Sequence, residues 1–306
     1  KSQTTRAVAA ALEEQDLTSV VVRHPMPYGD LVAQRVQRFA SYEDLARHRT
    51  TIEEREEYEP HLEAGRVVYA GVDYEAILRE AEKEADVVLW DGGNNDLPFF
   101  LPDLYIVVAD PLRQGHETRF HPGETNLRMA DVVVVNKIDS ASPEDLAAVI
   151  ATIESVNPEA EILTARSDLF LDGPSIGDKR VVVVEDGPTL THGGMTYGAG
   201  VVAARRFGAA ELVDPEPVAV GSIKTVLERY PDLEPLVPAM GYGETQMSEL
   251  KATLEATDAE VVLAATPIDL RGLLELEKPV TRVRYELAQA EGRPLAEVIR
   301  EALENE

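Results

Sequence analysis

The stretch Asp131-Val132-Val133-Val134-Val135-Asn136-Lys137-Ile138-Asp139 decides the fold class, because an apolar run leads directly into a polar motif. Four consecutive valines are typical of a strand buried on both faces, as in a parallel sheet. Similar apolar runs recur at residues 67–70, 87–90, 104–109 and 161–163. Helical patterns lie between several of them, at residues 74–84 and 143–156, and the charged segment 31–65 also favours helix. This alternation predicts an α/β fold with a doubly wound, mostly parallel sheet.

The polar motif after this strand, Asn136-Lys137-Ile138-Asp139, matches the Asn-Lys-x-Asp pattern of GTP-binding proteins. In that pattern the aspartate accepts hydrogen bonds from guanine, and the lysine packs along the base. Residues 164–166 follow the next helix and strand, where such proteins contact guanine through backbone N–H groups. Asn136, Lys137, Asp139 and Ala165 are therefore our candidates for base recognition.

Two other junctions carry signals for the phosphate side of a nucleotide site. Residues 87–90 run into Asp91-Gly92-Gly93, the form of a strand whose carboxylate lies by Mg²⁺ and whose glycine approaches the γ-phosphate. Lys1-Ser2 precedes a helical pattern and matches the end of a P-loop. Alone, the first signal also fits a tight turn and the second a chance dipeptide.

The order of these three signals along the chain is that of a P-loop nucleotidase, with each signal at a strand end or helix start. We therefore predict a P-loop NTPase fold with Mg²⁺ held by Ser2 and Asp91. Lys1 and Asp91 are predicted to act in catalysis. The residues predicted to bind GTP or ATP are Lys1, Ser2, Gly92, Gly93, Asn136, Lys137, Asp139 and Ala165.

Arginine and histidine gather in two predicted loops, residues 23–38 and 110–128. Arginine forks suit phosphate and carboxylate oxygens, and histidine can transfer protons near neutral pH. We predict a pocket for a second, anionic substrate, with His24 and Arg113 in catalysis. Its anion-binding arginines would be Arg23, Arg35, Arg38 and Arg119. Two alternatives remain open: these residues neutralise local acids such as Asp30, Glu117 and Glu124, or a metal is held by His24, His116 and His121.

A third loop, residues 185–200, is rich in glycine, threonine and histidine and lies between an apolar strand and a helix. Unpaired N–H groups at a helix start, with glycines that permit close approach, can bind an anion. This pattern predicts that Gly193 and Gly194 contact the anionic substrate and that His192 acts in catalysis. Glu185 and Asp186 are candidates for a metal site or a base. A purely structural turn is the alternative.

Composition limits the partners and the compartment. The 306 residues include 56 acidic and 29 basic side chains, a formal charge of −27, which opposes binding to a nucleic-acid backbone. There is no cysteine, no apolar run of about 20 residues and no signal-peptide pattern. We expect a cytoplasmic protein that acts on a small molecule and that could form a homo-oligomer. A Gly/Pro/Asp-rich stretch near residue 171 predicts a nucleotide-binding domain at 1–170 and a C-terminal α/β domain at 171–306.

Four segments resemble a family of predicted GTPases named after cyclic 2,3-diphosphoglycerate synthetase. They are residues 91–96, 123–131, 136–139 and 184–195. The likeness spans essentially the whole chain, and its first domain also looks like the GTPases that load metals into hydrogenase and urease. The resemblance implies a ligase in which a nucleoside triphosphate activates a phosphate of 2,3-diphosphoglycerate and the second phosphate closes the ring. The alternative is a regulatory or metal-delivery GTPase.

Members of that family also carry an N-terminal α/β domain and a complete glycine-rich loop before the position of Lys1. The chain starts after both, so we expect it to be truncated in its nucleotide domain and to bind nucleotide weakly. The expected substrate is a small phosphorylated polyanion.

Overall fold

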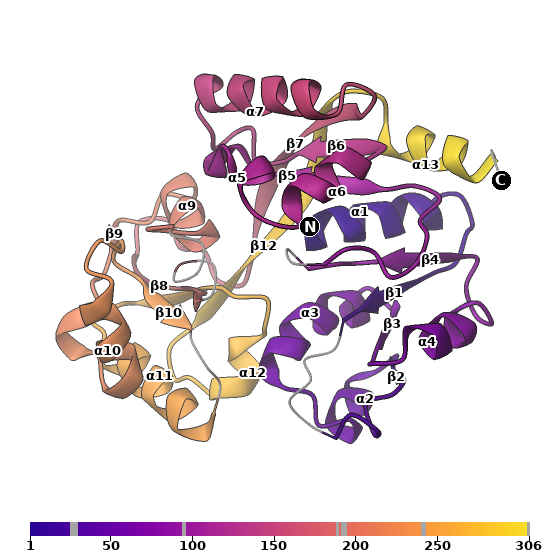
Figure 1. Cartoon of the computed structure of the whole chain (residues 1–306). Coiled ribbons are helices and arrows are strands. Elements are labelled where there is room, and N and C mark those ends of the chain that lie inside the picture. Colours follow the sequence, from indigo (N-terminus) through magenta and orange to yellow (C-terminus); the bar gives the residue numbers. More distant parts are fainter. Residues whose placement is uncertain (25–29, 94–95, 188–189, 191–194, 240–242, 305–306) are drawn as a thin grey trace. The chain divides into compact units, whose positions relative to one another are not determined.

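The computed structural model describes residues 1–306 except 25–29, 94–95, 188–189, 191–194, 240–242 and 305–306 (Figure 1). The chain divides into two compact units. Unit 1 comprises Lys1–Asp168 and Glu286–Glu306, and unit 2 comprises Leu169–Tyr285. Both consist of mostly parallel strands connected by helices, so the predicted α/β class is confirmed. None of the helices in the described parts combines the length and apolar character needed to cross a bilayer.

Unit 1 contains two groups of hydrogen-bonded strands. The first is a sheet with the order β2-β3-β1-β4, in which only β2 is antiparallel to its neighbour. Its strands are β1 (Ser19–Arg23), β2 (Gln37–Phe39), β3 (Val67–Ala70) and β4 (Val87–Trp90). The second group is parallel and consists of β5 (Ile106–Ala109), β6 (Val132–Val135) and the start of β7 (Glu161–Asp172). The segment 31–65 is not wholly helical, because β2 lies within it and pairs with β3.

The helices of unit 1 follow the capping and apolar patterns of the sequence. They are α1 (Ser2–Glu13), α2 (Tyr42–Arg47), α3 (Ile52–Glu63), α4 (Tyr74–Ala81), η1 (Pro111–Arg113), α5 (His116–Arg119), α6 (Gly123–Met129), α7 (Pro143–Val156) and α13 (Leu295–Glu304). Capping boxes start α2 and α3, where Ser41 and Thr51 each exchange hydrogen bonds with the acid three residues later.

The C-terminal residues 286–306 belong to unit 1, whereas the sequence placed them in a second domain at 171–306. Two interactions hold them there. Val298 and Ile299 of α13 share a buried cluster with Val8 and Leu12 of α1. In addition, β12 (Val280–Glu291) returns beside β7, with the Glu291 N–H donating to Thr164 Oγ1 at 3.1 Å. Both β7 and β12 are 12 residues long and run through both units.

The strands of unit 2 have the order β10-β8-β11-β12, with β9 also paired to β8, and they belong to the same eight-stranded sheet as β7, β6 and β5. The unit's own strands are β8 (Arg180–Asp186), β9 (Glu211–Leu212), β10 (Val237–Ala239) and β11 (Val261–Ala265). Its helices are α9 (Ala199–Arg206), η2 (Glu216–Val218), α10 (Gly221–Arg229), α11 (Glu244–Ala256) and α12 (Leu270–Leu274).

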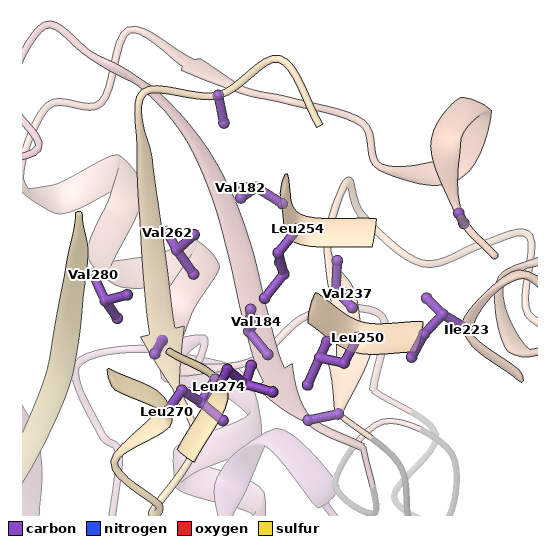
Figure 2. Close-up of a cluster of buried hydrophobic side chains, with 14 of the residues drawn as sticks. Val182, Val184, Ile223, Val237, Leu250, Leu254, Val262, Leu270, Leu274 and Val280 are labelled. Atoms are coloured by element: carbon purple, nitrogen blue, oxygen red, sulfur yellow. The ribbon is translucent and has the colours of Figure 1, made fainter. Parts of the chain in front are cut away.

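Buried side chains cover both faces of the unit 2 sheet, as expected for strands that are apolar at every position. On one face, Val182 and Val184 of β8 pack with Ile223 of α10 and Leu250 of α11 (Figure 2). On the other face, Val183 packs in a cluster with residues of α9. Each unit thus has its own buried hydrophobic core.

Candidate functional site

The carboxyl ends of β1 and β4 bring a group of charged side chains together in unit 1. Arg23 ends β1 and is fully buried, and its Nη1 lies 2.6 Å from Oδ2 of Asp91, the residue after β4. Its Nε donates a hydrogen bond to Glu57 Oε2 on α3 at 3.0 Å, and its Nη2 pairs with the same oxygen. The parallel register sets Val22 beside Trp90, so the next residues of the two strands also lie together. Arg23 therefore joins both strand ends to α3.

The ionisation of Asp91 follows from this arrangement. Burial alone would raise the pKa of this carboxyl, but the positive charges of Arg23 and Lys1 outweigh burial and lower its pKa. The side chain is only 3% exposed. Asp91 therefore stays ionised at neutral pH as a fixed buried anion.

Three arginines that the sequence assigned to an anionic substrate are paired with carboxylates of the protein. Arg23 is bound as described, and Arg35 Nε donates to Asp73 Oδ2 at 2.8 Å. Arg38 donates two hydrogen bonds to Glu84, at 2.8 and 2.6 Å. A carboxylate occupies a guanidinium as a substrate anion would. In the structure Arg23, Arg35 and Arg38 pair with acids of the protein, as in the alternative of local neutralisation, and their binding of substrate stays a prediction.

Arg113 and Arg119 differ from these three. Among the described residues neither forms an ion pair, and the buried Nε of Arg113 has no hydrogen-bond partner. An unsatisfied buried donor is unfavourable unless water or a ligand completes it. These two arginines therefore remain candidates for an anion. Three other predicted substrate or catalytic residues lie outside the described residues, namely His192, Gly193 and Gly194.

His24 lies next to the glycine pair that follows β4. Its Nδ1 is 2.8 Å from Asp96 Oδ2, which also accepts a hydrogen bond from the Gly93 N–H at 2.6 Å. A Cβ on Gly93 would lie 3.0 Å from the His24 ring, and one on Gly92 would lie 2.7 Å from Trp90 Nε1. A larger residue at either position would therefore require Trp90, Asp96 or His24 to move. Asp96 was missed as a site residue, although an acid shortly after a glycine pair was a readable signal.

The Asn-Lys-x-Asp motif lies at the end of β6, as the sequence predicted. Asn136 is buried, its Oδ1 accepts from the Lys137 N–H at 2.8 Å, and the Ile138 N–H donates to the Ala165 carbonyl at 3.2 Å. These bonds tie the motif to β7. Asp139 is exposed and has no hydrogen-bond or ion-pair partner among the described residues, so its carboxylate is available to a ligand.

Two residues that support this motif were missed from the sequence. Lys137 Nζ lies 2.7 Å from Oδ2 of Asp110, which follows β5. Gln3 of α1 accepts from Asn136 Nδ2 at 3.2 Å and donates to Ser167 Oγ on β7 at 2.9 Å. Neither pair is marked by local spacing, because the partners are far apart in the chain.

The first turn of α1 connects the two parts of the candidate site within unit 1. Lys1 Nζ lies 3.9 Å from Glu57 Oε1, beside the Asp91 group, while Gln3 is bonded to Asn136 beside the base-recognition motif. Ser2, between them, is the first residue of α1 and is partly exposed. The predicted phosphate side and base side thus meet at one helix start.

The described residues contain no group of three or more histidine and acidic side chains arranged to hold a metal. The predicted alternative of a metal held by His24, His116 and His121 therefore has no support. Mg²⁺ needs no such cage, since it keeps several waters and takes one or two protein oxygens beside phosphate oxygens. One hydroxyl from Ser2 and one carboxylate from Asp91 are a donor set of that kind.

Comparison with known proteins places the chain in a family. Residues 80–164 match the nucleotide-binding domain of the CobW/HypB/UreG family model. All 306 residues align at 59% identity with arginine synthetase ArcE of Thermococcus kodakarensis, and the chain spans 68% of that protein. The chain belongs to the ArcE family. Residues 80–164 are thus similar to the CobW/HypB/UreG nucleotide-binding domain, and the chain as a whole is similar to ArcE.

Similarity to the predicted diphosphoglycerate family is more local. The chain is 31% identical over 113 residues to cyclic 2,3-diphosphoglycerate synthetase of Thermococcus sibiricus. The aligned residues make up 36% of this ArcE-family chain and 26% of that protein. The corresponding protein of Pyrococcus furiosus is 30% identical over 81 residues, 26% of this chain and 19% of that protein. The structure of LpxK from Aquifex aeolicus in complex with ATP has a TM-score of 0.47 at 13% identity, over 98% of this chain and 84% of that one. A likeness at this level carries no functional inference.

Proposed function

We propose that this chain belongs to a nucleoside-triphosphate-dependent synthetase that makes arginine, the activity that the name of its relative ArcE describes. The observation that carries the proposal is 59% identity along the entire chain. The similarity to cyclic 2,3-diphosphoglycerate synthetases supports the same general chemistry, in which a nucleotide activates a small molecule by phosphoryl transfer.

Arginine carries a guanidinium group, and the reaction class follows from the chemistry of that group. A ureido oxygen can take the terminal phosphoryl group of a nucleotide, with cleavage of the bond between the β-bridging oxygen and the γ-phosphorus. A nitrogen nucleophile then forms a bond to the ureido carbon, and phosphate leaves with the electron pair of the carbon–oxygen bond. The substrates would be a ureido amino acid and ammonia.

The nucleotide would bind at the edge of unit 1 described above. Lys1 and the backbone at Gly92 and Gly93 would contact its phosphates, and the base would meet Asn136, Lys137, Asp139 and the backbone at Ala165. Mg²⁺ would be held by Ser2 and, directly or through water, by Asp91, and it supplies neutralisation of charge on the phosphates when bound. The fixed negative charge of Asp91 fits that role.

The second substrate would use the arginines that have no ion-pair partner among the described residues. Arg113 and Arg119 suit a carboxylate, and every amino-acid substrate carries one. The sequence predicted a phosphorylated polyanion as the substrate. The proposed substrate is instead an amino acid, whose negative group is its α-carboxylate. His24, held by Asp96, lies near the glycine pair and could transfer a proton there.

The test is a comparison of substrates with the complete protein. We expect release of nucleoside diphosphate and phosphate to depend on a ureido amino acid together with ammonium, and arginine to accumulate in equal amount. Phosphate release that instead requires 2,3-diphosphoglycerate would replace this proposal with the cyclising reaction. Slow GTP hydrolysis that responds to neither substrate would favour a metal-delivery GTPase.

A further inference from the structure

The loop that follows β5 in unit 1 is held in place by Asp110. Oδ1 of this residue accepts a hydrogen bond from the Leu112 N–H at 3.1 Å, and its carbonyl accepts one from the Arg113 N–H at 2.9 Å. The other carboxylate oxygen, Oδ2, lies 2.7 Å from Lys137 Nζ. Since β5 and β6 are parallel neighbours, the loop and the Asn-Lys-x-Asp motif lie at the same edge of the sheet. The start of the loop is therefore fixed beside the base-recognition motif.

Two charged side chains of this loop have a buried atom without a hydrogen-bond partner. The atoms are Nε of Arg113, at the end of η1, and Oε1 of Glu117, in α5. Among the acidic, lysine and arginine side chains of the described residues, only Arg23 and Asp91 also contain such atoms, and those two form an ion pair with each other. In the same part of the chain, Arg113 and Glu117 form no ion pair, either together or with another residue. They are therefore exceptional, and both lie in one loop.

The two atoms need a ligand that both accepts and donates. A buried polar atom without a partner is unfavourable, and more so when the group is charged. The guanidinium Nε–H can only donate, and the carboxylate Oε1 can only accept. Four residues separate Arg113 from Glu117, so their Cα atoms lie within about 14 Å of each other and their long side chains can reach one small molecule. That molecule would carry a negative and a positive group close together.

We propose that Arg113 and Glu117 together bind the head group of a zwitterionic amino acid. The α-carboxylate would accept a hydrogen bond from Arg113 Nε, and the α-ammonium group would donate one to Glu117 Oε1. This inference rests on the proposed function, in which the substrate is a ureido amino acid, and it adds the acid that recognises the amino group. In the ureido amino acid with the carbon chain of arginine, three methylene groups separate the head from the ureido group. The head can therefore be bound away from the reacting atoms.

Glu117 also makes the site selective among small anions. Arginine alone binds a phosphate or any carboxylate. A phosphorylated polyanion or a dicarboxylate would bring a second negative charge towards the Glu117 carboxylate and would leave its buried oxygen without a donor. An amino acid satisfies both side chains, so the pair favours it over the phosphorylated substrate that the sequence predicted.

The simpler role for these atoms is to bind ordered water, and the chain offers a matched control. Glu124 of α6 is a nearby acid whose Oε1 accepts two hydrogen bonds from Arg128, at 3.0 and 2.7 Å. Glu124→Gln removes one negative charge from the same part of unit 1. It does not remove a buried atom that lacks a partner, so it controls for charge alone.

The experiment compares citrulline, the ureido amino acid with the carbon chain of arginine, with two analogues. One analogue lacks the α-amino group and the other lacks the α-carboxylate. In the complete protein, we expect Glu117→Gln to lower kcat/KM for citrulline about 10- to 100-fold and to change the value for the analogue without the amino group by less than about threefold. Arg113→Met should give the same contrast with the analogue that lacks the carboxylate, and Glu124→Gln should keep all three values. Titration calorimetry replaces kinetics for an analogue that is not turned over.

Equal losses with citrulline and both analogues, or no loss in either variant, would overturn the inference and assign the two atoms to ordered water. We expect both variants to unfold at no lower temperature than the unmodified protein, because the substituted atoms have no protein partner to lose. If Glu117→Gln does not fold, Glu117→Asp takes its place with the same expected contrast between substrates. Failure of the proposed function has a different signature, because the unmodified protein would then release no phosphate in response to citrulline and ammonium.

Discussion

Asp91 in unit 1 and Glu185 in unit 2 are both buried acids at the carboxyl end of a parallel strand, and each is 3% exposed. Their environments differ in one respect. Asp91 lies 2.6 Å from the guanidinium of Arg23, whereas the hydrogen bonds that Glu185 accepts from the described residues come from the backbone N–H groups of Gly198 and Val201. The pKa of Asp91 is lowered, while the pKa of Glu185 is raised to about 7.

The difference shows what a buried carboxylate needs in order to stay ionised. Backbone N–H groups carry no net charge, so at Glu185 their hydrogen bonds do not offset the loss of hydration. A guanidinium supplies a full positive charge and does offset it at Asp91. Unit 1 thus holds a carboxylate that stays ionised, and unit 2 holds an acid that can gain and lose a proton near neutral pH.

The largest expected effect comes from removing the cation at Asp91. Arg23→Met leaves Asp91 and Glu57 buried or half-buried without their partner, and we expect a loss of about 3–5 kcal/mol in the free energy of unfolding at pH 7. Urea denaturation measures it. The control is Arg38→Met, which breaks an exposed pair with Glu84 and should cost no more than about 1 kcal/mol. Similar losses in the two variants would mean that burial does not distinguish the two ion pairs.

The second effect is on the pH dependence of stability and tests Glu185. Its pKa is about 7 in the folded protein against 4.5 for an ordinary glutamate, so its stabilising contribution is complete below about pH 4.5 and is lost as the pH rises to about 7. Glu185→Gln does not titrate at this position. We therefore expect the variant to gain about 3 kcal/mol relative to the unmodified protein between pH 4 and pH 8. Unfolding curves across this range measure the difference, and a constant offset would show that the pKa of Glu185 is ordinary.

A third, smaller effect concerns an acid that is not buried. Asp139 is exposed and unpaired among the described residues, so unlike the two buried acids it should contribute to binding alone. Asp139→Asn should weaken GTP binding about 10- to 100-fold, equivalent to about 1.4–2.7 kcal/mol, and leave the affinity for ATP and the unfolding free energy nearly unchanged. Titration calorimetry with both nucleotides measures it. Binding of ATP without any binding of GTP to the unmodified protein would remove the guanine assignment.

The sequence predicted the features that depend on local pattern. The structure contains the predicted buried strand at Val132–Val135, and the polar motif follows its end. The acid and the glycine pair likewise follow the end of the strand Val87–Trp90. The continuous valines decide burial on both faces, and the order of the motifs decides the fold class. These features need no knowledge of distant contacts.

The sequence could not predict which charges meet in space. Arg23 was expected to bind substrate, but it is paired with Asp91 and with Glu57, which is 34 residues away on a helix where acids are frequent. Nothing local marks Glu57 among its neighbours. The strand β2 was missed because it is only three residues long and partly polar. The helix α13 was predicted in the C-terminal domain but lies in unit 1, because an apolar stripe on a helix does not indicate which element it packs against.

The smallest expected effect is on the pH dependence of stability at Glu249, a carboxylate that accepts hydrogen bonds from Ser222 at the start of α10 but is not fully buried. The pKa of Glu249 is lowered by its hydrogen bonds to Ser222, so its contribution is present above the ordinary value of 4.5 and is lost as the pH falls. Glu249→Gln should therefore lose stability relative to the unmodified protein as the pH rises from 3 to 6, the opposite direction to Glu185→Gln. The same series of unfolding curves detects both. If the two variants changed in the same direction, the start of a helix, rather than burial without a cation, would determine how these acids ionise.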